Sequence, residues 1–162
     1  MLIRDPKQSQ HLLYDIEDGE FFKDHALFSK QEHAIQIQLF FFFTNECCNP
    51  LGSKRGIHKL GAIYFTLRNV WPKYNSRLLN IHLAALFHAQ DIKTYRFEKI
   101  LAPLVQDVSA LETNGIQIPL FDHTVYGTII QVNGDNLGIH SLFGFVESFS
   151  ARYCCRFCLL EK

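Results

Sequence analysis

Hydrophobic and polar residues alternate most clearly in residues 35–43, where Ile-Gln-Ile-Gln-Leu gives way to four phenylalanines. This pattern predicts a strand that is half exposed at its start and buried at its end. A second β-rich run covers residues 60–68 and is closed by Asn69 and Pro72. Residues 78–87 alternate as well and predict a third strand, although their alanines and leucines would also suit a buried helix.

Further along the chain the spacing of apolar residues changes to offsets of three and four. It predicts a helix over residues 97–113, with Gly115 placed to end it. Pro103 lies inside this helix, so we expect its regular part to begin nearer residue 102. Residues 126–132 are a short β-branched strand that leads into Asn-Gly-Asp-Asn. A second amphipathic helix follows, with the apolar stripe Ile139, Leu142, Phe145, Val146 and Phe149.

The order of these elements predicts one α/β (α+β) domain. It covers residues 34–162 in the order β-β-β-α-β-α and follows an irregular or helical N-terminal segment over residues 1–33. Three consecutive strands, a helix and a strand parallel to the first form the opening half of an RNase H-like fold. In that fold one acid lies on the first strand and a second at the end of the fourth, so the two side chains meet where adjacent strands converge.

Acidic and basic residues are unevenly distributed along the chain although their numbers are equal. The 162 residues carry 16 Lys and Arg against 16 Asp and Glu, which argues against a wholly cationic nucleic-acid-binding surface. No carboxylate occurs between Glu46 and Asp91, whereas acids crowd the region from Asp15 to Asp24. The cations of the carboxylate-free stretch are Lys54, Arg55, Lys59, Arg68, Lys73 and Arg77. They form either a functional patch or a solvated face.

Asp135 is the leading candidate for a catalytic, metal-binding residue. A carboxylate directly after a strand is exposed at the carboxyl edge of a sheet, where a divalent metal can be held. The alternative is a turn or a helix N-cap, which aspartate serves equally well. No apolar stretch approaches the length of a membrane span and no signal-peptide core opens the chain, so we expect an intracellular, reducing compartment and no membrane partner.

The cysteines fall in two clusters. Cys155 and Cys158 have the two-residue spacing that lets both thiolates reach one tetrahedral Zn²⁺, which makes them half of a zinc site. The alternative is a pair of reduced cysteines near a chain end. The remaining ligands would have to come from elsewhere, and the internal candidates are Cys154, His140, Cys47 and Cys48.

Six short sequence motifs follow one another along the chain. They are Asn49-Pro50-Leu51-Gly52-Ser53, the run from His58 to Asn69, Leu101-Ala-Pro-Leu-Val-Gln-Asp107, Gly134-Asp135-Asn136, Gly144-Phe145 and Cys155-Arg156-Phe157-Cys158. This set, from about residue 12 to the end, resembles transposable-element-derived proteins and looks like the core of CACTA-type DNA transposases. The resemblance implies an RNase H-like core that cuts and joins DNA in the nucleus with two Mg²⁺ or Mn²⁺ ions held by three acids.

On this resemblance Asp135 corresponds to the second acid, and Lys54, Arg55, Lys59 and Arg68 would contact DNA phosphates beside it. The first acid departs from the pattern, because Glu46 is the only carboxylate near Asn49-Pro50. The third acid and the other zinc ligands would lie beyond Lys162, so we expect a C-terminally incomplete, degenerate active site that binds no metal and is catalytically inactive. The alternatives are a non-catalytic DNA- or protein-binding module that uses the basic stretch 54–77, and a chain that does not fold stably.

Overall fold

The computed structural model describes residues 16–31, 33–46, 59–148, 150–153 and 155–157. Its elements, in chain order, are η1 (Ile16–Asp18), α1 (Glu20–Asp24), α2 (Ala26–Lys30), β1 (Ile35–Glu46), β2 (Lys59–Leu67), η2 (Pro72–Tyr74), η3 (Leu78–Asn80), β3 (His82–His88), α3 (Ala89–Thr113), β4 (Ile116–Gln117), β5 (Thr124–Val125), β6 (Gly127–Gly134) and α4 (Asn136–Phe143). The predicted mixed α/β class is therefore confirmed. Within the described ranges, no helix combines the length and apolarity that crossing a bilayer requires.

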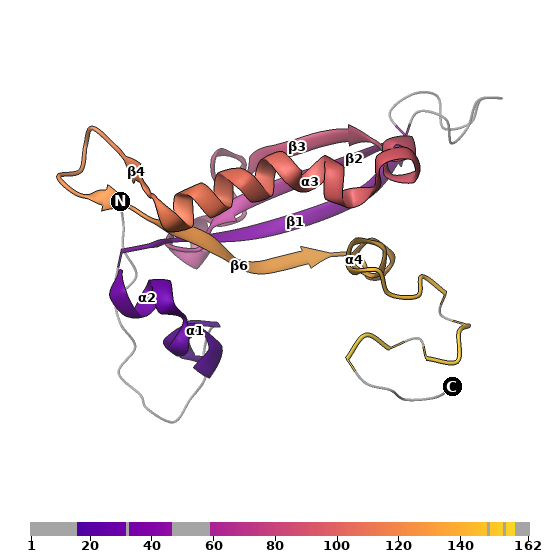
Figure 1. The fold of residues 1–162 in the computed structure, drawn as a ribbon, viewed down its shortest axis with the longest axis horizontal. Helices are drawn as coiled ribbons and strands as arrows, with labels where there is room; N and C mark the ends of the chain where they lie inside the picture. The colour runs from indigo at the N-terminus through magenta and orange to yellow at the C-terminus, as the bar shows by residue number, and fades with distance from the viewer. Residues whose placement is uncertain (1–15, 32, 47–58, 149, 154, 158–162) are drawn as a thin grey trace. The chain divides into compact units, whose positions relative to one another are not determined.

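The main sheet has the strand order β3-β2-β1-β6, with β1 between β2 and β6 (Figure 1). Gly127 lies against Ile35 and Gly134 against Phe41, so residue numbers rise together and β6 runs parallel to β1. The amide of Arg68 donates to the carbonyl of Gln36 at 2.8 Å, and the ring of Phe42 meets that of Tyr64 at 5.8 Å. Between these two contacts the residue numbers rise along β1 and fall along β2, so β2 is antiparallel to β1.

The strand β3 is antiparallel to β2. The Phe65 and His82 rings are 5.0 Å apart at one end of the pair, and a Cβ on Gly61 would meet the Phe87 ring at the other. The sheet is therefore mixed, as expected for three strands joined in sequence followed by a parallel one. A separate two-stranded sheet, β4 with β5, pairs Ile116 with Val125 and was not predicted from the sequence.

The strands expected at 35–43 and 60–68 are confirmed as β1 and β2, with β1 continuing to Glu46. The expected burial pattern of the first strand is wrong, because Gln36 near its start is 8% exposed and Phe42 near its end is 55% exposed. The strand expected at 78–87 is corrected at its start, because residues 78–80 form η3 and β3 begins at His82. The cause is local: the amide nitrogen of the Asn80 side chain donates to the carbonyl of Tyr74 at 2.7 Å, and its backbone N–H donates to Arg77 at 2.9 Å. These bonds hold a turn where alternation alone indicated a strand.

α3 contains a break at Arg96, whose φ of 58° and ψ of 167° are not helical. The helix after this break therefore starts at residue 97, as predicted, and continues through Pro103, so the expected start near residue 102 is wrong. Pro103 is the seventh residue after the break and has no N–H to donate to the carbonyl of Lys99, yet the helix continues through it. Gly115 ends the helix as predicted, with a φ of 66° and an N–H that donates to Ala110 at 3.2 Å.

α4 is shorter than the predicted helix. It ends at Phe143, and Gly144 adopts a left-handed φ of 71°. The N–H groups of Gly144 and Phe145 donate to Ser141 and His140 at 3.4 and 2.8 Å, which is the hydrogen-bond pattern of a Schellman cap. Phe145 and Val146 therefore lie outside the helix on which the apolar stripe had placed them.

The chain divides into two compact units, each built from three chain segments. The first unit comprises residues 1–39, 65–82 and 102–131, and the second comprises residues 40–64, 83–101 and 132–162. Among the described residues, the buried apolar side chains of the first unit are Leu27, Ala34, Ile37, Leu39 and Val125, and those of the second are Phe41, Ile63 and Ile139. The N-terminal residues 16–31 are mostly helical, as expected, and belong to the first unit.

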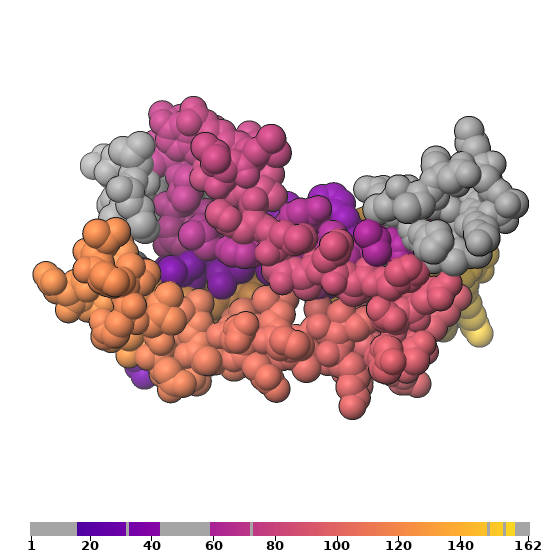
Figure 2. Space-filling model, turned by 90° about the horizontal axis from the view of Figure 1, so that it is seen from above, coloured from indigo at the N-terminus to yellow at the C-terminus, as the bar shows by residue number. Residues whose placement is uncertain are grey.

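In the first unit, α3 lies against β6. Gly127 is in contact with the Leu111 side chain, and the Thr128 hydroxyl donates to the Glu112 carboxylate at 2.8 Å. In the second unit the start of α3 meets β3 through an edge-to-face pair of Phe87 and Phe97, with ring centroids 6.4 Å apart. No described residue of α3 is fully buried, and Figure 2 shows its residues, from salmon to orange, exposed on the visible face.

Candidate functional site

Asp135 stands between β6 and α4. Its extended backbone, with φ −66° and ψ 163°, leaves the strand, and its Oδ1 accepts a hydrogen bond from the N–H of Gly138 at 2.6 Å. Gly134 before it leaves little room for a side chain, because a Cβ there would stand 3.1 Å from the Ile139 side chain and from the carbonyl of Phe41, closer than an ordinary van der Waals contact. Asp135 is thus an N-cap, which is one of the two roles that the sequence allows.

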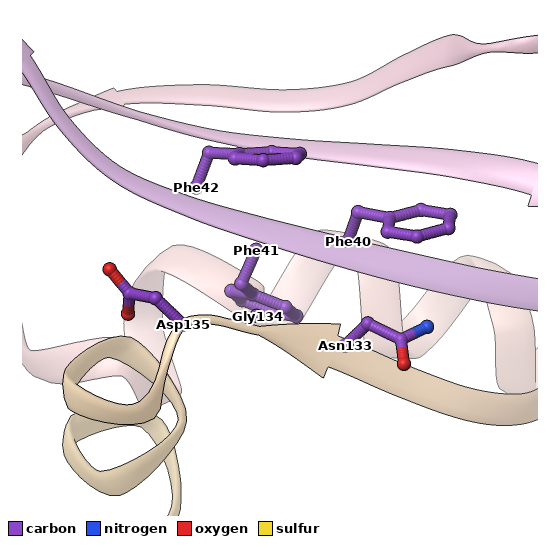
Figure 3. A pocket seen from close by; sticks show the side chains of 6 residues that line it. All are labelled: Phe40, Phe41, Phe42, Asn133, Gly134 and Asp135. Carbon is purple, nitrogen blue, oxygen red and sulfur yellow. The ribbon is translucent and has the colours of Figure 1, made fainter. Parts of the chain in front are cut away.

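A hollow of about 290 Å³ in the second unit brings Asp135 close to the middle of the phenylalanine run. Figure 3 shows its lining residues, which are Phe40, Phe41, Phe42, Asn133, Gly134 and Asp135. Phe40 and Phe42 point to one side of β1 and Phe41 to the other, and the Asp135 carboxylate points away from the Phe41 ring (Figure 3). Asp135 is exposed, whereas Phe41 is only 3% exposed. The surroundings of this carboxylate on β1 are therefore apolar.

Glu46 is not brought beside Asp135 by the register. Gly134 contacts the backbone of Phe41, and Glu46 is the last residue of β1, five positions further on. Since a strand rises ~3.3 Å per residue, the backbone of Glu46 lies roughly 16 Å beyond that of Phe41. A two-metal site holds its ions only about 4 Å apart. The Glu46 side chain lies outside the part of the chain whose side chains are described.

The metal that the resemblance implies does not fit the described residues around Asp135. One carboxylate oxygen already accepts the Gly138 N–H, and the neighbouring lining on β1 consists of phenylalanines, which cannot ligate a cation. Among the described residues, no three His, Cys, Asp or Glu side chains cluster closely enough to hold an ion. The register of β1 and β6 therefore does not bring the backbone of Glu46 beside Asp135.

The half zinc site is described at one of its two positions. Cys155 is exposed, and its Sγ accepts a hydrogen bond from the N–H of Phe157 at 3.4 Å. Cys158 and the other cysteines lie outside the described residues. His140 is 4% exposed and its Nδ1 donates to the carbonyl of Val146 at 2.6 Å, so that nitrogen serves as a structural donor. The zinc site stays a prediction.

The two expected DNA contacts that the structure describes, Lys59 and Arg68, lie far apart. Lys59 begins β2 and Arg68 directly follows its last residue, so the two cations stand at opposite ends of a nine-residue strand, roughly 30 Å apart. The antiparallel register places Lys59 at the Glu46 end of β1 and Arg68 at its start. Lys54 and Arg55 lie outside the described residues. Only Lys59 of the described pair lies at the end of the sheet that carries Asp135.

Arg156, which the sequence offered only as part of the Cys155–Cys158 run, makes two contacts in the structure. Its guanidinium donates to the Asn136 side-chain oxygen at 2.9 Å and lies over the Phe157 ring at 4.6 Å. It lines a second hollow, of about 460 Å³, together with residues of β6 and α4. In the sequence, the cation–ring contact is indicated by the neighbouring cation and aromatic residue, Arg156 and Phe157, inside Cys-x-x-Cys. This Arg–Asn bond ties the C-terminal segment to the first turn of α4.

A second feature is the segment of residues 71–80 in the connection between β2 and β3, which we call the basic loop and which contains the last two cations of the basic stretch, Lys73 and Arg77. Lys73 Nζ lies 5.8 Å from the Trp71 ring centroid and 4.9 Å from that of Tyr74, and the Arg77 guanidinium lies 4.3 Å from Tyr74. Leu78 and Leu79 follow, each 87% exposed. Figure 2 shows this segment, in magenta, on the visible surface.

Comparison with known proteins adds no relative: no protein-family model, curated protein or solved structure matches the chain. Its function is therefore inferred from the residues and their geometry.

Proposed function

We propose that the chain is a nuclear, transposase-derived module that is related to metal-dependent DNA strand cleavage and transfer and that does not itself cleave DNA. The second half of this proposal rests on one observation: the β1 residue beside the end of β6 is the buried Phe41, at the position from which a ligand would have to share an ion with Asp135. A lone Asp135 cannot position two divalent ions, because hard cations need several oxygens from different directions.

The first half rests on the sheet order and on the ordered sequence motifs. β6 runs parallel beside β1, and its last residue delivers Asp135, as the opening half of an RNase H-like core requires. Asp135 caps α4 through the bond to Gly138, so it has a structural use without any metal. This arrangement supports a core that has kept its framework and lost its ligand set.

The test is a cleavage assay with the full chain, an end-labelled DNA duplex and either Mg²⁺ or Mn²⁺. We expect no product above a protein-free control, and the same result for Asp135→Asn. Asp122→Asn serves as the matched control, because Asp122 is an exposed carboxylate that lies in none of the six motifs and does not line the hollow. Metal-dependent cleavage that Asp135→Asn abolishes and Asp122→Asn preserves would refute the proposal.

A second candidate is a non-catalytic module that binds DNA through the basic stretch 54–77. It is favoured by the absence of carboxylates between Glu46 and Asp91 and by the position of Lys59 at the Asp135 end of the sheet. Binding would fall steeply with salt, because each neutralised phosphate releases counterions. Charge reversal at Lys54 and Arg55 should weaken a duplex gel shift while Asp135→Asn leaves it unchanged. The absence of any shift at low salt would remove this candidate.

A further inference from the structure

The basic loop is held in one conformation by its own backbone. The N–H groups of Tyr74, Arg77 and Asn80 donate to the carbonyls of Trp71, Tyr74 and Arg77 at 2.8, 3.1 and 2.9 Å. The Asn80 side chain adds a bond of 2.7 Å to the Tyr74 carbonyl. Because these turns are closed, the loop presents its side chains with little ordering entropy left to lose on binding.

Two exposed cations of this loop are held against aromatic rings. Lys73 and Arg77 are four residues apart and both lie near the Tyr74 ring, at 4.9 and 4.3 Å. Such contacts orient a cation and leave its other hydrogen-bond donors pointing to solvent. The surface therefore offers two oriented positive charges to an anionic partner.

The next two residues argue for a protein rather than a nucleic acid as that partner. Leu78 and Leu79 are each 87% exposed. Adjacent leucines gain free energy on contact with another apolar surface and have no use against a phosphate backbone. The partner should therefore present carboxylates beside an exposed apolar side chain.

The same chain carries such a segment in α1. Glu20 and Asp24 are both exposed and lie one helical turn apart, which places them on one face. Phe21, between them in sequence, is 74% exposed. The spacing of four residues between the two acids matches that between Lys73 and Arg77. With equal numbers of acidic and basic residues, the whole chain also lacks the net charge that keeps copies apart.

We infer that the basic loop binds α1 of a second copy of this chain. Glu20 and Asp24 of one copy pair with Lys73 and Arg77 of the other, while Phe21 covers the leucine pair. Two copies related by a two-fold axis make this contact twice, which closes the dimer. The inference goes beyond the proposed function and uses none of the residues of the leading proposal, whereas Lys73 and Arg77 also belong to the basic stretch 54–77 of the second candidate.

The experiment measures molar mass by sedimentation over a concentration series, at about 20 mM and about 500 mM NaCl, where screening differs strongly. We expect a reversible monomer–dimer equilibrium that salt weakens. Arg77→Glu and Glu20→Lys should each weaken dimerisation by about tenfold or more, because each puts like charges in both contacts. Lys99→Glu, at an exposed position on α3, is the control and should leave the equilibrium unchanged.

Mixing the two reversed variants is the decisive step. In a mixed dimer, the new Glu at 77 meets the new Lys at 20, and the original Arg77 meets the original Glu20, so equal amounts should restore dimers that neither variant forms alone. Unchanged far-UV circular dichroism and melting temperature show that the variants are folded. A mixture that stays monomeric, or a wild-type chain that is monomeric throughout, overturns the inference. So does a monomeric chain whose oligonucleotide binding is lost in Arg77→Glu.

Discussion

Replacing Asp135 should change the free energy of unfolding in opposite directions, depending on whether the residue is a helix cap or a metal ligand. The carboxylate accepts the Gly138 N–H at 2.6 Å and sits at the positive end of the α4 dipole. Asp135→Ala leaves that N–H without its acceptor, and loss of an N-cap costs typically ~1 kcal/mol. Asp135→Asn keeps an oxygen acceptor and should cost only a few tenths of a kcal/mol, through the weaker interaction with the helix dipole.

Urea denaturation followed by circular dichroism measures this difference. With a slope of about 2 kcal/mol per molar urea, Asp135→Ala should lower the midpoint by about 0.5 M, and Asp135→Asn should shift it by less than about half of that. A carboxylate cluster predicts the opposite, because acids gathered for a metal repel one another when no metal is bound. Both substitutions would then raise the midpoint, and Mn²⁺ would stabilise the wild-type chain alone. Either result would refute the N-cap interpretation.

Three further substitutions test the packing and pairing of β1 and β2 by the same denaturation measurement, with Leu120→Ala as an exposed control. Ile63 is fully buried at 0% exposure, so Ile63→Val should cost about 0.5–1.5 kcal/mol, whereas Leu120→Ala, at 89% exposure, should change stability by less than about 0.5 kcal/mol. Asn69 accepts the Gln36 N–H at 2.7 Å and donates to the Ala34 carbonyl at 2.9 Å, so Asn69→Ala should cost about 1–3 kcal/mol by leaving backbone groups of β1 unbonded. Gly127→Ala would place a Cβ 2.8 Å from the Ile35 Cβ and 2.9 Å from its carbonyl oxygen, and should cost about 1–3 kcal/mol. Unchanged midpoints for these three would show that the β1 pairing is wrong.

The main strands and the long helix were predictable because a single periodicity dominates each of them. Residues 35–39 alternate and residues 60–68 are rich in β-forming residues, and the buried positions of the two strands include Leu39, Phe41 and Ile63. Failures occurred where a local backbone feature overrode the pattern. Apolar spacing continues past Gly144, but its left-handed φ of 71° ends α4.

Two other features had no signal in the sequence. Arg96 has a positive φ of 58°, a conformation that favours glycine, and nothing in its neighbours marks it. The register between β1 and β6 is the second. Alternation shows which residues share a face, but a slide of β6 along β1 by two residues would preserve that pattern and change which residue lies beside Gly134. Position 41, opposite the end of β6, could therefore be read only from the structure.

The phenylalanine run explains why a single substitution should not convert this site into one that binds metal. Phe41 is 3% exposed and Phe42 is 55% exposed, although both line the hollow beside Asp135. Phe41→Asp would lose a core aromatic side chain, worth about 3–5 kcal/mol, and bury a charge that has no partner. Phe42→Asp, on the exposed side of β1, should cost much less and leave the chain folded.

Thermal melts of the two variants check this directly. Phe41→Asp should lose its cooperative transition, and Phe42→Asp should melt within a few degrees of the wild-type chain. If Phe41→Asp folds and gains Mn²⁺-dependent stabilisation, position 41 is a vacant ligand position and the core needs only one change to bind metal. If it unfolds, this part of β1 is required for core packing: the Phe41 side chain occupies the position where a ligand would have to be, and a metal site cannot be built there without replacing the apolar contacts around it.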